Sequence, residues 1–231
     1  MTLSGRHIYL FGGDKPWSFE SWVASDDRVR GGKSQSYLDG ASEPPGTVRF
    51  HGELDITALG GAGFASQRSP DTQHWDLKSF RGLRLAITKG DGKKYTLIVK
   101  DEVLPKRPDG REQSTVSWEY DFTGHEIELD IPWENFKPTY RGKPKLDAKP
   151  LDLTNVTRIS IMMRSFFGEQ EGPFDLGLQY IAAVMSEEQA RVSDSDTLAK
   201  VDSPSPNLDS TKQQERAPGI SLLSCLRGVF K

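Results

Sequence analysis

The sequence predicts an all-β protein: an antiparallel β-sandwich of the jelly-roll type, followed by a disordered C-terminal tail. Three observations predict this fold. Apolar and polar residues alternate in most segments before Met185, no segment there carries a helical stripe longer than two turns, and the composition changes abruptly after Val184. Parallel sheets need long crossover connections, usually helices, so short strands without them favour two antiparallel sheets packed face to face.

The alternation also locates about nine strands, each with one face expected to be buried. In chain order they cover residues 7–11, 48–54, the region around Phe64, 83–87, 95–99, 116–122, 127–131, 159–163 and 174–180. Residues 89–93, Lys-Gly-Asp-Gly-Lys, separate two of them. Because Asp-Gly readily adopts the positive φ angles of a tight turn, we expect a β-hairpin there.

Composition divides the chain into three parts: a sandwich domain at 1–185, a polar tail at 186–219 and a short amphipathic segment at 220–231. The polar tail has no aromatic residue and is rich in Ser, Asp, Gln and Pro, so it should stay disordered and the domain should fold without it. The last segment has an apolar helical stripe that could dock on a partner or a membrane surface. Its residues are Leu222, Leu223, Leu226, Val229 and Phe230.

Charge and cysteine content exclude several classes of protein. The chain has 30 Lys and Arg against 33 Asp and Glu, so its net charge of -3 gives no general attraction to nucleic acid. The single cysteine, Cys225, permits neither an internal disulfide nor a multi-cysteine zinc site. No apolar run approaches the roughly 18 residues of a membrane span. Residues 1–13 resemble no secretory or mitochondrial leader, so these sequence features predict a cytoplasmic location.

Motifs of catalysis or cofactor binding are incomplete. Residues 28–34 end in Gly-Lys-Ser, but Asp27 stands where a phosphate loop needs glycine, so a tight turn leading into a strand is favoured. The glycines of 59–64 are followed by Pro70 where a dinucleotide-binding helix should run. There is no Gly-x-Ser-x-Gly elbow, and the four histidines are dispersed. We therefore expect no catalytic residue, no metal ion, no cofactor and no enzymatic activity.

Eight short segments, taken in their order, resemble the complex I intermediate-associated protein 30 family, whose members assist the assembly of mitochondrial NADH:ubiquinone oxidoreductase. The resemblance extends from residue 7 to about 184, and the family usually has methionine where Arg30 stands. The segments are Trp22 with 25–34, then 50–54, 61–68, 80–83, 89–95, 131–136, 140–142 and 172–176.

This resemblance implies a galactose-binding-like β-sandwich that acts as a non-catalytic assembly factor or chaperone-like scaffold. Its partners would be protein clients, complex I assembly intermediates among them, and its compartment the mitochondrion, in contrast to the cytoplasm favoured above. An intracellular carbohydrate-binding or general protein-interaction module is the alternative function, because related sandwiches bind sugars on aromatic platforms.

The turns shared with the family supply the candidate contact residues. Acidic and basic side chains flank two glycine-rich turns, so we expect Asp26, Asp27, Arg28 and Arg68 to lie near one another at a loop end. Charge pairing there would fix the turns or present them to a client. The full candidate set is Asp26, Asp27, Arg28, Gly31, Gly32, Ser34, Arg68, Asp91 and Arg141.

Overall fold

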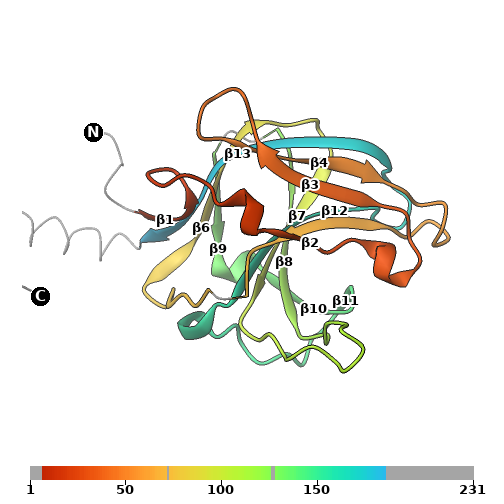
Figure 1. Cartoon of the computed structure of the whole chain (residues 1–231). Helices are drawn as coiled ribbons and strands as arrows, with labels where there is room; N and C mark the ends of the chain where they lie inside the picture. Colours follow the sequence, from red (N-terminus) through yellow and green to blue (C-terminus); the bar gives the residue numbers. More distant parts are fainter. Residues whose placement is uncertain (1–6, 72, 126–127, 186–231) are drawn as a thin grey trace, which may run out of the picture.

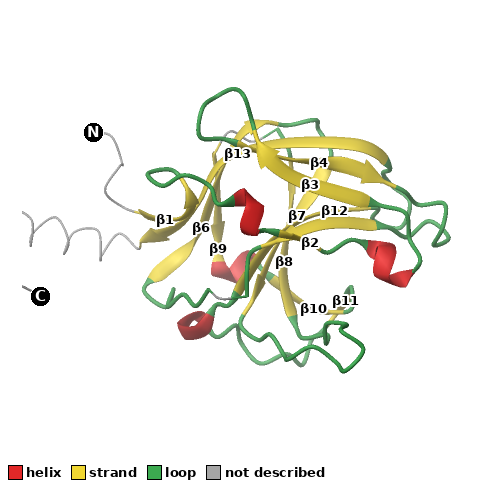
Figure 2. Ribbon diagram, viewed as in Figure 1, coloured by secondary structure: helices red, strands yellow, loops and turns green. Residues whose placement is uncertain are grey.

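A computed structural model describes residues 7–71, 73–125 and 128–185, and its two packed β-sheets appear in Figures 1 and 2. Every strand pair is antiparallel, which confirms the predicted β-sandwich. The described residues contain no α-helix, only four short 3₁₀ turns: η1 (Phe19–Ser21), η2 (Asp27–Arg30), η3 (Trp133–Asn135) and η4 (Leu153–Asn155). The polar tail at 186–219 and the docking segment at 220–231 lie outside the described residues.

The six-stranded sheet is organised around β13, a strand of 14 residues. β4 and β1 pair with successive halves of one edge of β13, and β6 runs along the other edge. The sheet order is β3-β4-β13-β6-β9. The strands are β1 (His7–Gly12), β3 (Gln35–Gly40), β4 (Val48–Leu54), β6 (Phe80–Lys89), β9 (Glu128–Pro132) and β13 (Gly172–Met185).

The seven-stranded sheet has the order β11-β10-β8-β7-β12-β5-β2. Its long central strands correspond to the alternating segments at 95–99, 116–122 and 159–163, and the short β2, β10 and β11 lie at or near its edges. The strands are β2 (Val23–Ala24), β5 (Phe64–Arg68), β7 (Lys94–Lys100), β8 (Ser117–Thr123), β10 (Lys137–Tyr140), β11 (Lys143–Pro144) and β12 (Arg158–Arg164).

The core lies between the sheets, where every second side chain of the central strands packs inward. On β7 and β12 the outward side chains are largely buried as well. Phe50 of β4, Tyr95 of β7 and Phe174 of β13 bring their rings together, with centroids 5.0 to 6.4 Å apart. Aliphatic side chains complete the layer, and each fully buried one contributes about 1.5 to 3 kcal/mol relative to exposure. They include Leu54, Leu83, Leu85, Leu97, Ile159, Ile161 and Leu176.

The expected β-hairpin at 89–93 is wrong. A turn does form there, with Gly92 at φ +79°, but β6 belongs to the six-stranded sheet and β7 to the seven-stranded one. The Asp91 carboxylate accepts hydrogen bonds from the Tyr95 hydroxyl (2.8 Å) and the Asp175 backbone N–H (2.9 Å), which holds the turn against β13. Alternation predicts which face of a strand is buried, but it does not identify the neighbouring strand.

Candidate functional site

One end of the sandwich, here called the loop end, is formed by η2 with residues 31–34, residues 55–64 and residues 165–171. In Figure 1 it lies at the right, at the opposite end of the sandwich from β1. Direct hydrogen bonds join the three parts: the Phe64 N–H donates to Asp27 (3.0 Å), and Gly63 and Ser165 exchange two further bonds (3.0 and 3.2 Å). The two glycine-rich turns seen in the sequence therefore lie side by side.

Asp27 is the anchor of the loop end and is fully buried. It accepts hydrogen bonds from the Ser34 N–H (3.1 Å) and the Ser34 hydroxyl (2.7 Å), besides the one from Phe64. Ser34 Oγ in turn accepts a bond from the Asp55 N–H (3.1 Å), which continues the connection to the next loop. Gly32 is required here, since a Cβ would lie 2.1 Å from an Asp27 carboxylate oxygen.

Asp26 has a parallel role one residue earlier. It accepts bonds from the Ser36 hydroxyl (2.6 Å), the Ser36 N–H (3.1 Å) and the Ser66 N–H (2.9 Å), and so links β3 with β5. Burial raises the pKa of Asp26, against the opposing effect of these hydrogen bonds. Both aspartates thus act as acceptors that position the loops.

Arg68 is buried on β5 and makes no pair with either aspartate. Its guanidinium contacts Glu112 (2.7 Å) and Asp71 (3.1 Å), so the expected charge pairing with Asp26 and Asp27 is wrong. The reason is geometric: Arg68 lies opposite Ser160, on the outer face of the seven-stranded sheet, where its partners come from later loops.

The exposed part of η2 carries Arg28, Val29 and Arg30, followed by Gly31 in the left-handed region at φ +86°. Val29 is 73% exposed, and the Arg30 guanidinium lies 5.5 Å from the centre of the Phe64 ring. Within the described part of the chain, neither arginine has an ion-pair partner.

The loop at 165–171 presents an exposed aromatic residue that the sequence reasoning missed. Phe166 (φ 46°) and Phe167 (φ 62°) are both in the left-handed region that non-glycine residues rarely adopt, and Phe167 is 94% exposed. The Ser165 carbonyl accepts bonds from the N–H groups of 168, 169 and 170, and the Gln170 side chain bonds both the N–H and the carbonyl of Lys94. The signal in the sequence is Ser-Phe-Phe-Gly, which interrupts the alternation directly after β12.

The remaining candidates lie apart. Asp91 is near the loop end, since Lys93 of the same turn donates to the Glu171 carbonyl (2.6 Å). Arg141, in the turn between β10 and β11, donates to Ser114 (3.3 Å) and lies beyond the opposite end of the seven-stranded sheet. The structure therefore brings together the residues around η2 and Asp91, but neither Arg68 nor Arg141.

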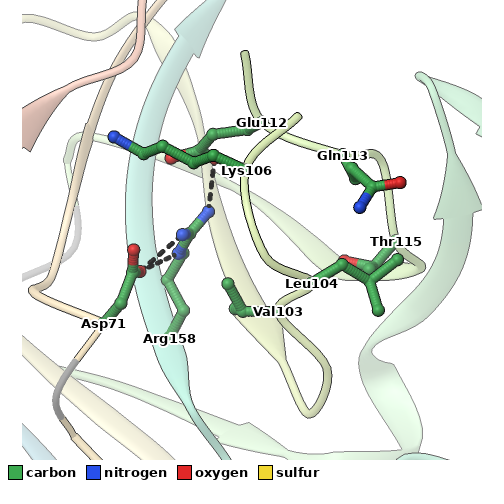
Figure 3. A pocket seen from close by; sticks show the side chains of 8 residues that line it. All are labelled: Asp71, Val103, Leu104, Lys106, Glu112, Gln113, Thr115 and Arg158. Carbon is green, nitrogen blue, oxygen red and sulfur yellow. Dashed lines mark hydrogen bonds and ion pairs between the residues drawn. The ribbon is translucent and has the colours of Figure 1, made fainter. Parts of the chain in front are cut away.

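A second charged cluster covers the outer face of the seven-stranded sheet beneath residues 101–116, the segment that links β7 and β8. Figure 3 shows Arg158 between Asp71 (2.8 Å) and Glu112 (2.8 Å). Lys100 donates to Thr115 (2.9 Å), and burial, with the nearby Arg158, lowers the pKa of Lys100 to about 8. The hollow beside these residues encloses about 20 Å³, which is room for about one water molecule.

No group of three or more potential metal ligands occurs among residues 7–71, 73–125 and 128–185. The sequence matches the family described as complex I intermediate-associated protein 30 over residues 10–178. The chain belongs to this family. An uncharacterized protein of Schizosaccharomyces pombe is 43% identical over 184 residues, covering 77% of this chain and 84% of the relative.

Members of the complex I intermediate-associated protein 30 family are named for complex I assembly, while this member's fold is similar to carbohydrate-binding modules. A family 11 module of the Clostridium thermocellum cellulase Lic26A-Cel5E aligns with a TM-score of 0.52 at 14% identity, covering 77% of this chain and 94% of the module. The same family's module from that organism, in complex with a β-1,3-1,4-mixed-linked tetrasaccharide, has a TM-score of 0.50 at 15% identity, covering 79% and 96%. At these identities the likeness establishes the jelly-roll fold alone.

Proposed function

We propose that the protein is a non-catalytic assembly scaffold whose protein clients include partly assembled respiratory complex I. The observation that carries the proposal is the family match, which extends over nearly the whole sandwich. The structure of the loop end supports it. A general acid or base must reach its substrate, whereas Asp27 is fully buried and its carboxylate is occupied by donors from its own chain.

The loop end has the features of a binding surface. Loops that are fixed on a rigid scaffold commonly carry recognition, because they are exposed while the sheets hold them in place. Here two buried carboxylates fix the loops, and Arg28, Val29 and Gly31 remain on the outside. Recognition by such a surface needs no cofactor.

Copurification tests the scaffold role. The tagged full chain is purified from its own cells, associated proteins are quantified, and assembled complex I is measured by native electrophoresis after depletion and rescue. We expect complex I subunits in the purified fraction, a loss of assembled complex I on depletion, and its recovery with the wild-type chain. If depleted cells keep normal amounts of complex I and the tagged chain copurifies with a different multi-subunit complex, the protein is a scaffold but complex I is not its client.

A carbohydrate-binding role is the second candidate, and one surface feature favours it. Tyr37 is 44% exposed on the outer face of the six-stranded sheet, and its ring lies 5.4 Å from that of His51. His51 contacts Asp39 (2.8 Å), and Arg49 follows on the same face. An exposed ring beside paired polar groups suits a sugar. Glycan-array binding that Tyr37→Ala abolishes would support this role over the first.

A further inference from the structure

We propose that the loop end contacts a membrane surface, with Val29 and Phe167 entering the headgroup region of an anionic bilayer and Arg28, Arg30 and Lys33 meeting lipid phosphates. This goes beyond the scaffold function because it says where the scaffold is held, and its test needs no client.

The two apolar side chains are exposed on turns whose backbones are fixed by hydrogen bonds. Phe167 is 94% exposed and Val29 is 73% exposed, so neither contributes much to the core. A left-handed conformation at both Phe166 and Phe167 is costly and persists only where surrounding bonds impose it, as the Ser165 carbonyl and Gln170 do here. An unfavourable backbone conformation is thus maintained at a residue whose aromatic ring is exposed to water.

The charges around η2 complement an anionic surface. Arg28, Arg30 and Lys33 are exposed, and none has an ion-pair partner in the part of the chain that the structure describes. The loop end also carries the carboxylates of Asp55, Glu169 and Glu171, and Glu169 pairs with Lys94 (3.1 Å). The positive charge is therefore concentrated on η2 and the turn that follows it. Guanidinium groups bind phosphate oxygens in a bidentate manner, and each cation near an anionic leaflet strengthens binding about fivefold.

Two separate apolar tips suit a lipid surface. Here the two apolar tips stand on different loops, and exposed Gly60 and Ala62 belong to the segment between those loops. Separate tips can each enter the boundary between headgroups and acyl chains without a continuous patch. No helix in the described part of the chain is long and apolar enough to cross a membrane.

Vesicle sedimentation of the full chain tests the proposal, with phosphatidylcholine vesicles that contain or lack phosphatidylserine. We expect binding to the anionic vesicles alone, weakening as salt is added. Phe167→Asn should bind about tenfold more weakly, since asparagine tolerates the left-handed conformation but loses the apolar ring. The double variant Arg28→Glu, Arg30→Glu should lose binding. Leu146→Asn, a 95% exposed residue after β11, is the matched control and should bind as the wild type does.

Several outcomes would overturn the proposal. If Phe167→Asn and Leu146→Asn bind vesicles equally well, the membrane contact is made by another part of the chain, such as residues 220–231. Absence of vesicle binding by the wild type, or equal binding with and without phosphatidylserine, would also refute it. If Phe167→Asn lowers the melting temperature, Val29→Asn takes its place in the sedimentation assay and should also weaken vesicle binding. The vesicle assay contains no client, so its failure refutes the membrane contact and leaves the scaffold function to the copurification test.

Discussion

The carboxylate of Asp27 accepts hydrogen bonds from both the backbone N–H and the hydroxyl of Ser34, at 3.1 and 2.7 Å, in a site without solvent access. This one pair closes the turn from η2 into β3. Since Asp27 also accepts from the Phe64 N–H, it links that turn to β5 of the seven-stranded sheet. Asp27 therefore joins the two sheets at the loop end, alongside the bonds that Asp26 makes to Ser36 and Ser66.

Replacing Asp27 by alanine should lower the free energy of unfolding by about 3 kcal/mol. The N–H groups of Ser34 and Phe64 would lose their acceptor, and the Ser34 hydroxyl would keep the Asp55 carbonyl (3.2 Å). Chemical denaturation measures the change. Arg28→Ala, on the exposed side of the same turn, is the control and should stay within about 0.5 kcal/mol of the wild type. A loss below about 1 kcal/mol for Asp27→Ala would mean that the site is hydrated and that the loops are held in another way.

The two glycines of the same turn should respond differently to alanine. At Gly31 a Cβ would meet nothing within 4 Å, so Gly31→Ala should cost only the left-handed conformation, about 1 kcal/mol. At Gly32 a Cβ would lie 2.1 Å from the Asp27 carboxylate, so Gly32→Ala must displace that side chain and should cost clearly more. Melting temperatures of the two variants give the comparison, and equal losses would contradict the steric argument.

Much of the sandwich could be predicted from the alternation alone. Leu97 and Ile161 lie in such segments, and both are fully buried in the core between the sheets. Strand partners could not be read in the same way, because the period of two is the same whichever strand lies alongside. The turn at Asp91 looked like a hairpin for this reason, although its carboxylate bonds link it to β13.

The loop end was only partly predictable. The sequence correctly favoured a glycine turn leading into a strand over a phosphate loop, and β3 begins at Gln35. It suggested arginine partners for Asp26 and Asp27, whereas the structure supplies Ser34 and Ser36. A buried carboxylate is satisfied as well by hydroxyl and N–H donors, which are too common in sequence to point to one another.

Lys100 should make stability depend on pH in the alkaline range. Its pKa is lowered to about 8 in the folded protein from 10.5 otherwise, so between these values the unfolded chain binds a proton that the folded chain lacks. The free energy of unfolding should therefore rise by about 2 to 3 kcal/mol from pH 8 to 10.5 relative to Lys100→Met. Denaturation at several pH values measures this difference. Lys143→Met, an exposed lysine in β11, should keep the wild-type profile, and a flat difference for Lys100→Met would refute the argument.

Glu112 should hold residues 101–116 against the sheet. Its carboxylate contacts Arg68 (2.7 Å) and Arg158 (2.8 Å), two buried arginines on the rigid strands β5 and β12. Glu112→Gln removes one carboxylate from the cluster, so Arg68 and Arg158 keep their ion pairs with Asp71 alone. Residues 101–116 should then detach from the sheet more often while the sandwich stays folded.

Trypsin can report this opening at the Lys106–Arg107 bond, because Lys106 lies within the segment, is exposed and is remote in sequence from the substituted residue. Under conditions in which opening precedes cleavage, Glu112→Gln should be cut there at least fivefold faster than the wild type, as a free energy of opening lowered by about 1 kcal/mol implies. Glu102→Gln is the matched control, since only its backbone carbonyl is used, by Thr115 (2.8 Å), and it should be cut at the wild-type rate. Equal rates for the two variants would show that the contacts of Lys100 with Thr115 hold the segment without help from Glu112.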